Sequence, residues 1–236
     1  MSAPGRVVVI AGASGNLGGV LAGVLAREGA NIAAIGRSPA QASALVESLE
    51  RPLSHLALGG LDLSEPSACG EAIEQTLRRF GRLDGLVHTV GGFASAPVER
   101  NSVDLFERMF RLNVLTCVNI FAAALPPMRE RRRGSLVAVG AGAGSRAGAG
   151  LAAYGAAKAG LARLVESVAE EARADGVRAN LVAPGALDTP QNRASISAAE
   201  HGSLVRMEDV ANAIAFLLSD RAAGVSGVCL PVGFRS

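Results

Sequence analysis

The fold of this chain is decided by residues 7–18, which read Val7-Val8-Val9-Ile10-Ala11-Gly12-Ala13-Ser14-Gly15-Asn16-Leu17-Gly18. Five apolar residues in succession predict a strand that is covered on both faces, and the glycines predict a tight turn into a helix. Glycines let a backbone approach a pyrophosphate, while a helix N-terminus offers free N–H groups and a positive dipole. We therefore predict a nucleotide cradle formed by Gly12, Ser14, Gly15, Asn16, Leu17 and Gly18.

Short apolar runs alternate with helical patterns along the rest of the chain. The apolar runs predict strands at 6–11, 31–35, 56–58, 83–88, 135–139, 178–183 and 227–232. The helical patterns lie at 17–28, 39–50, 65–80, 103–125, 153–174 and 208–218. Apolar strands joined by helices are typical of a parallel sheet with both faces covered. We therefore expect an α/β protein with one domain over residues 1–236. Its Rossmann fold would be a doubly wound, mostly parallel seven-stranded sheet with helices on both faces.

Punctuating residues support these helix boundaries. Ser38 and Ser64 each precede an early proline and are predicted to cap the helices that follow. Gly29, Gly81 and Gly176 stand where helices are expected to end, a position that favours glycine.

Length and composition exclude several classes of protein. A chain of 236 residues, 49% of them hydrophobic, can bury one sizeable core. A net charge of +2 is too small to predict a nucleic-acid partner. We interpret the basic residues after Pro127 as a helix end favoured by the helix dipole; they are Arg129, Arg131, Arg132 and Arg133.

The cysteines and the N-terminus bear on the compartment. Cys69, Cys117 and Cys229 are scattered and lack metal-ligand spacing, which predicts a reducing compartment and no metal site. We see neither a charged leader nor an apolar run long enough to span a bilayer. We therefore expect a cytoplasmic protein without a membrane partner.

Tyr154 and Lys158 lie four residues apart in a predicted helix, so the phenol and the ammonium share one face. A cation about 4 Å from a phenolate, at an effective dielectric of about 20, contributes about 4 kcal/mol. That is enough to bring the pKa of a tyrosine from about 10 to about 7 and make it a proton donor near neutral pH. The alternative is a packed ring beside a solvated ammonium.

The predicted second strand bears on the choice of cofactor. Gly36-Arg37 follows it, with no carboxylate to bind a ribose 2′-hydroxyl, and Arg37 could pair with a 2′-phosphate. This favours NADP(H), with NAD(H) possible; alternatively, Arg37 is an exposed turn residue. Asp62 follows the third strand, where it could bind an adenine amino group or cap the helix near Ser64.

Together these residues resemble the short-chain dehydrogenase/reductase family over nearly the whole chain. The motifs occur in order: Gly12–Gly18, Asp62, Asn113, Tyr154-x-x-x-Lys158 and Asn180-x-x-x-Pro184-Gly185-x-x-x-Thr189. The resemblance implies that Tyr154 exchanges a proton with the substrate while Lys158 lowers its pKa and holds the nicotinamide ribose. Asn113 would keep a water in a proton relay. Further cofactor contacts would come from Asp62, Leu63, Val90, Gly91, Pro184, Gly185 and Thr189.

The chain also departs from the family pattern. Ala141 stands where members carry a serine that binds the substrate carbonyl, and Ser145 is the nearest hydroxyl that could replace it. A lost oxyanion donor typically lowers the rate by two to three powers of ten, or about 3–4 kcal/mol. Asn16 replaces a usual glycine, and we interpret His88, at a strand end, as a satisfied histidine. Ala141 and the segment 187–193 are similar to dihydropteridine reductases, which dispense with the serine.

Three functions remain open on these residues. The first is an NAD(P)H-dependent oxidoreductase that acts on a small carbonyl or imine. The second, suggested by Ala141, is a nucleotide-binding sensor or scaffold with little redox turnover. The third is a dehydratase that uses the same tyrosine. The resemblance further implies a homo-oligomer, a dimer or a homotetramer, packed through the helices 103–125 and 153–174.

Overall fold

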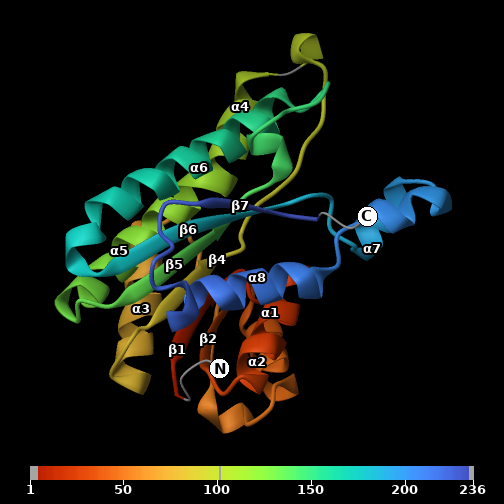
Figure 1. Cartoon of the computed structure of the whole chain (residues 1–236). Helices are drawn as coiled ribbons and strands as arrows, with labels where there is room; N and C mark the ends of the chain where they lie inside the picture. Colours follow the sequence, from red (N-terminus) through yellow and green to blue (C-terminus); the bar gives the residue numbers. More distant parts are fainter. Residues whose placement is uncertain (1–4, 101, 234–236) are drawn as a thin grey trace.

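The computed structural model describes residues 5–100 and 102–233, and its centre is one seven-stranded sheet (Figure 1). All strand pairs are parallel, in the order β3-β2-β1-β4-β5-β6-β7. The strands are β1 (Val7–Ala11), β2 (Asn31–Gly36), β3 (Leu56–Gly59), β4 (Gly85–His88), β5 (Gly134–Val139), β6 (Val177–Pro184) and β7 (Cys229–Val232). The strand order reverses between β1 and β4, as a doubly wound sheet requires. The predicted α/β fold is confirmed.

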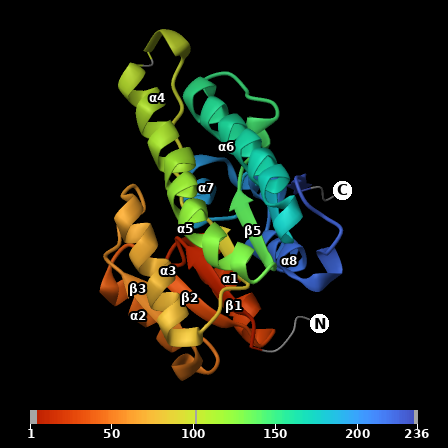
Figure 2. The same cartoon turned by 90° about the vertical axis from the view of Figure 1, so that its left-hand side faces the viewer.

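Helices cover both faces of the sheet. One face carries α1 (Asn16–Arg27), α2 (Pro39–Ser48) and α8 (Met207–Leu218), and the hydrophobic core there includes Leu21, Val46 and Ile214. The other carries α3 (Pro66–Phe80), α4 (Val103–Phe110), α5 (Thr116–Glu130) and α6 (Ala152–Glu171), which Figure 2 shows toward the viewer. A short helix, α7 (Pro190–Ser195), projects beyond β6 (Figure 1).

The helix boundaries agree with the sequence at some ends and not at others. The Ser38 hydroxyl accepts from the Gln41 N–H at the start of α2, as predicted. The prediction that Ser64 caps α3 is wrong, because the helix begins after Glu65 without a side-chain cap. The Ser64 N–H is instead bound by a carboxylate oxygen of Asp62, at 2.9 Å.

The helix expected at 103–125 is longer than predicted. Val103–Glu130 is continuous, with a π-helical turn at Arg111–Leu115 between α4 and α5, and Pro126 and Pro127 lie inside it. In the described part of the chain, this run is long and apolar enough to cross a membrane by length and composition, contrary to our expectation. Half of its apolar window is buried, and α5 contributes Ile120 and Phe121 to the core beside the sheet. We therefore describe it as a core helix.

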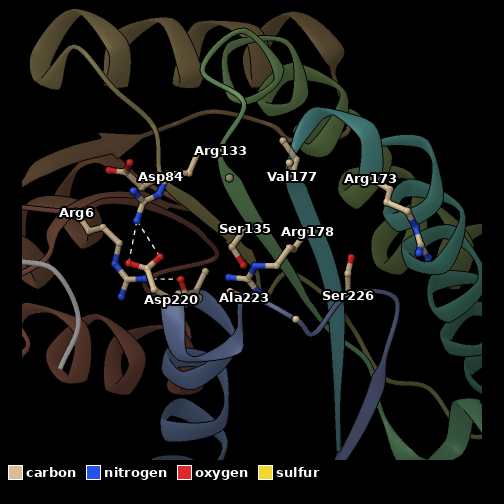
Figure 3. Close-up of a pocket in the computed structure, with 14 residues that line it drawn as sticks. Arg6, Asp84, Arg133, Ser135, Arg173, Val177, Arg178, Asp220, Ala223 and Ser226 are labelled. Atoms are coloured by element: carbon tan, nitrogen blue, oxygen red, sulfur yellow. Dashed lines mark hydrogen bonds and ion pairs between the residues drawn. The ribbon is translucent and has the colours of Figure 1, made fainter.

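Several arginines lie beside the N-terminal ends of the strands (Figure 3). Ligands in this fold bind at the opposite, carboxyl ends. Arg6 and Arg178 donate to the Leu218, Leu217 and Ser219 carbonyls at the C-terminus of α8. Arg133 binds both oxygens of Asp220, at 2.8 and 2.9 Å. These guanidinium groups line a cavity of about 370 Å³, and they stabilise the negative end of the α8 dipole.

Candidate active site

The turn after β1 packs closely against the residues that follow β4. Gly12 has φ +86°, and a Cβ on it would lie 2.7 Å from the Thr89 hydroxyl oxygen. That hydroxyl donates to the Ala11 carbonyl at 2.8 Å, which ties the turn to the end of β4. Helix α1 begins after Gly15 with no side-chain cap, so its first N–H groups are open to an anion. The turn therefore has the geometry of a phosphate cradle.

A cleft of about 510 Å³ extends from this turn across the carboxyl ends of β1, β2 and β4. Eight of the predicted cofactor residues line it: Gly12, Ser14, Gly15, Arg37, Asp62, Leu63, Val90 and Gly91. The other predicted cofactor residues lie outside the cleft lining: Asn16, Leu17, Gly18, Tyr154, Lys158, Pro184, Gly185 and Thr189. Sequence reasoning did not single out Ile35, Gly36, Gly60, Leu61, Thr89, Leu112 and Thr116, which also line it.

Two charged residues stand at the rim of the cleft. Arg37 is exposed, and its backbone N–H is held by the Ser14 hydroxyl at 3.3 Å, so its side chain is free to meet a ligand. Asp62 is also exposed, and hydrogen bonds from Ser64 lower the pKa of its carboxyl. Asp62 lines the cleft, as a contact to an adenine amino group requires, whereas its carboxylate binds the Ser64 N–H before α3 begins and does not cap that helix.

Asn113 lies in the π-helical turn and is fully buried. Its amide donates to the Met109 carbonyl at 2.9 Å and to the Gly92 carbonyl at 3.1 Å, and its oxygen accepts from the Gly92 N–H at 3.3 Å. A Cβ on Gly91 would lie 2.7 Å from the Asn113 oxygen and 3.4 Å from the Lys158 nitrogen. The structure thus brings Asn113 and Lys158 together against one glycine at the edge of the cleft.

Lys158 and Tyr154 share one face of α6, as their spacing predicts. The Lys158 ammonium is buried, donates to the Val139 carbonyl at 2.9 Å, and lies 5.9 Å from the centre of the Tyr154 ring. Burial lowers the pKa of Lys158 to about 8. The expected lowering of the Tyr154 pKa is not found, and burial of the phenol raises that pKa instead. The Lys158 ammonium is directed to the Val139 carbonyl at the end of β5.

The hydroxyl that could replace the missing serine has an interaction of its own. Ala141 is half-buried and extended, with φ −162°, in the loop that follows β5. Ser145 is exposed, and its hydroxyl interacts with the Cys229 thiol on β7. The Ser145 side chain therefore has a partner outside the group formed by Asn113, Tyr154 and Lys158.

The segment around α7 is linked to the glycine turn. The Thr189 hydroxyl caps α7 by accepting from the Asn192 N–H at 3.1 Å. The Asn16 amide donates to the Gln191 side-chain oxygen at 3.0 Å. This contact joins residues 175 positions apart, so no local pattern could have revealed it.

Phe93, on the loop after β4, is a further residue that packs beside Tyr154. The two rings meet edge to face, with centroids 5.1 Å apart, and Phe93 is 67% exposed.

The parallel sheet, the glycine turn and the cleft at its carboxyl edge define a Rossmann-like α/β protein. The family model for short chain dehydrogenases matches residues 6–200. The chain therefore belongs to the short-chain dehydrogenase/reductase family, as its motifs predicted.

Several known proteins are similar to this chain over nearly its full length. The 3-oxoacyl-(acyl-carrier-protein) reductase FabG of Escherichia coli is 29% identical, covering 98% of this chain and 97% of the relative. The cis-4-hydroxycyclohexanecarboxylate dehydrogenase of Sinomonas cyclohexanicum is 34% identical, covering 96% and 94%. A short-chain type dehydrogenase/reductase structure from Mycobacterium ulcerans superimposes with a TM-score of 0.91 at 28% identity, covering 98% and 90%.

Proposed function

We propose that the protein is an NAD(P)(H)-dependent oxidoreductase that interconverts a small carbonyl or imine substrate and its reduced form. The observation that carries this proposal is the convergence of Asn113 and Lys158 on Gly91, beside a cleft that begins at the glycine turn. The named activities of the relatives, a carbonyl reductase and a cyclic-alcohol dehydrogenase, support the same class of reaction.

The residues present fit a dinucleotide. Gly12, Gly15 and Gly91 line the cleft without side chains, and the uncapped start of α1 offers N–H donors to phosphate. Arg37 and Asp62 line the cleft, where Arg37 would bind a 2′-phosphate and Asp62 an adenine amino group. When bound, the nicotinamide supplies or accepts a hydride.

The chain's own residues would handle the proton and the substrate. Tyr154 is the proposed proton donor in reduction and acceptor in oxidation, with Phe93 packed on its ring. Lys158, held by the Val139 carbonyl, supplies a buried positive charge that favours the tyrosinate as the proton leaves. Asn113 fixes the loop at Gly92 and thereby the floor of the site.

Initial rates with NADPH and NADH test the proposal over ketones, quinones and a quinonoid dihydropterin, the last because of the predicted similarity to dihydropteridine reductases. We expect turnover with at least one carbonyl or imine, and a preference for NADPH. Arg37→Ser should reduce the preference for NADPH over NADH about tenfold or more, since charge-assisted pairing with phosphate is worth about 1.5–3 kcal/mol.

Arg206→Ser is the matched control, because Arg206 is also exposed but lies outside the cleft lining. Absence of turnover with both cofactors would refute the oxidoreductase proposal. Cofactor binding measured by calorimetry without turnover would favour the sensor or scaffold suggested by Ala141.

We further propose that the protein assembles as a homo-oligomer through α4, α5 and α6. Apolar side chains on these helices remain exposed, among them Phe106 at 37% and Phe110 at 44%, and they border a groove of about 440 Å³ against Ala153 and Ala156. Such a patch is typical of an interface between subunits.

Sedimentation velocity should give a mass of two or four chains, and Phe106→Glu should shift it toward one chain. Phe216→Glu is the matched control, because Phe216 on α8 is equally exposed on the other side of the sheet. A native protein that sediments as one chain at micromolar concentration would contradict the assembly.

A further inference from the structure

His88 is the last residue of β4, at the carboxyl edge of the sheet, and it is fully buried. Its ring Nε2 lies 2.9 Å from the Thr116 hydroxyl oxygen, and Thr116 lines the cleft. The sequence predicts a satisfied histidine here, but one ring nitrogen of His88 has no hydrogen-bond partner among the described residues.

The Thr116 hydroxyl donates its one proton to an acceptor other than His88. That hydroxyl donates to the Leu112 carbonyl at 2.8 Å, in the same helix. Because a hydroxyl has one proton to give, Nε2 of His88 must be the donor to the Thr116 oxygen. His88 is therefore the neutral tautomer that is protonated at Nε2, and its Nδ1 is a lone-pair acceptor.

Nδ1 of His88 is buried and has no hydrogen-bond partner among the described residues. An unpaired buried acceptor is costly, so a donor is expected close to it. The Lys158 ammonium has three N–H groups, one of which binds the Val139 carbonyl. Val139 follows Ala138, the residue of β5 that is paired with His88.

The charge of the Lys158 ammonium also acts on the His88 ring. Burial and then the Lys158 charge lower the pKa of His88 to about 3, so the ring is neutral at physiological pH. The same charge acts on the buried Cys117 thiol of α5, while Tyr154 lies on the helix of Lys158 itself. His88 is thus a second neutral acceptor in reach of the Lys158 charge, besides the Val139 carbonyl.

We propose that Nδ1 of His88 accepts a hydrogen bond from the Lys158 ammonium, directly or through one water, and that His88 is a positioning residue for Lys158. An acceptor at this point favours the protonated amine, because an ammonium forms a stronger hydrogen bond than the neutral amine does. His88 would thereby keep Lys158 charged at the pH where the site must work. This role rests on the proposed oxidoreductase function, whereas the hydrogen bond itself does not.

Nitrogen NMR of histidine-labelled protein tests the hydrogen bond without any turnover. The chain has three histidines, and His55 is an internal reference: its Nδ1 accepts from the Ile32 N–H at 3.0 Å, and its Nε2 lies 2.8 Å from the Glu50 carbonyl. We expect the Nδ1 signal of His88 to be that of an unprotonated nitrogen, with its chemical shift changed by hydrogen bonding as in His55. In Lys158→Met, the Nδ1 signal of His88 should move to the value of a free acceptor while that of His55 stays.

Protonation at Nδ1 of His88, or an Nδ1 signal that Lys158→Met does not change, would overturn the proposal. If that variant does not fold, the effect of His88→Leu on the titration of the Lys158 side chain decides the same question. We expect the pKa of Lys158 to fall by about one unit in His88→Leu, since one hydrogen bond to a charged group is worth about that much. An unchanged pKa of Lys158 in His88→Leu would also contradict the proposal.

Kinetics then test the functional part. In His88→Leu, the basic limb of the kcat–pH profile should move about one pH unit toward acid, so that kcat falls up to tenfold above pH 8 and little at pH 6.5. His88→Asn should restore the limb, because its amide oxygen can take the place of Nδ1. His55→Leu removes another buried histidine, which binds the Ile32 N–H of β2, and should leave the limb in place.

A limb that moves equally in His88→Leu and His55→Leu would show that the effect is one of stability alone. If the native protein has no turnover, the proposed function fails while the NMR result stands or falls by itself.

Discussion

Replacing Tyr154 by phenylalanine should lower kcat/KM by a factor of about 10² to 10⁴, the usual contribution of a positioned acid–base group. The dissociation constant of the cofactor and the melting temperature should change little. The reason is that the variant removes one oxygen while the ring keeps its edge-to-face packing on Phe93, 5.1 Å away. A steady-state assay paired with calorimetric cofactor titration measures both quantities.

The same residue can be titrated directly, because Tyr154 is the single tyrosine of the chain and there is no tryptophan. Burial raises the pKa of Tyr154 in the ligand-free protein. The tyrosinate absorbance should therefore appear only above the ordinary tyrosine value of about 10, and should be absent in Tyr154→Phe. Phe93→Ala is the control for packing, since it disturbs the ring contact without removing the hydroxyl. If Tyr154→Phe and Phe93→Ala lose activity equally with unchanged pH profiles, proton transfer by Tyr154 is contradicted.

The raised pKa of Tyr154 could not be predicted from the spacing of Tyr154 and Lys158 alone. Two residues at i and i+4 share a helix face whatever surrounds them, so the proximity of Tyr154 and Lys158 followed from the sequence. The destination of a long side chain depends on the nearest acceptor, and the Lys158 ammonium reaches the Val139 carbonyl of β5. The sequence therefore predicted that Tyr154 and Lys158 are neighbours, but not that Lys158 binds the Val139 carbonyl.

The fold could be predicted from the sequence more completely than the site could. Apolar strands and a glycine turn are local patterns, and they were sufficient for the parallel sheet and for the first βαβ unit. The π-helical turn that carries Asn113 was invisible, because its residues read as an ordinary helix. The contact of Asn16 with Gln191, and that of His88 with Thr116, depend on tertiary packing. Ala141, by contrast, was visible in the sequence as a departure from a pattern, and the structure sharpens its consequence.

Ala141→Ser should raise kcat/KM for ketone reduction tenfold or more, provided that the chemical step limits the rate. Ala141 is half-buried and extended in the loop that leaves β5, two residues beyond the carbonyl that holds Lys158. A hydroxyl placed there adds a donor toward a developing oxyanion, and such donors are worth about 10² to 10³ in rate. Because the added group acts on oxygen, imine reduction should gain much less. The ratio of ketone to imine rates is therefore the quantity to measure.

Ser145→Ala is the matched control, because that hydroxyl interacts with the Cys229 thiol and should contribute nothing to either rate. An equal loss of ketone reduction in Ser145→Ala would assign the missing role to Ser145 and contradict our interpretation. A ratio that does not move in Ala141→Ser would show that the native site polarises its substrate by another group, or that its substrate needs no oxyanion donor. In the second case the alanine is itself a specificity feature, because a site without the donor gives up ketones that depend on it and retains substrates protonated on nitrogen.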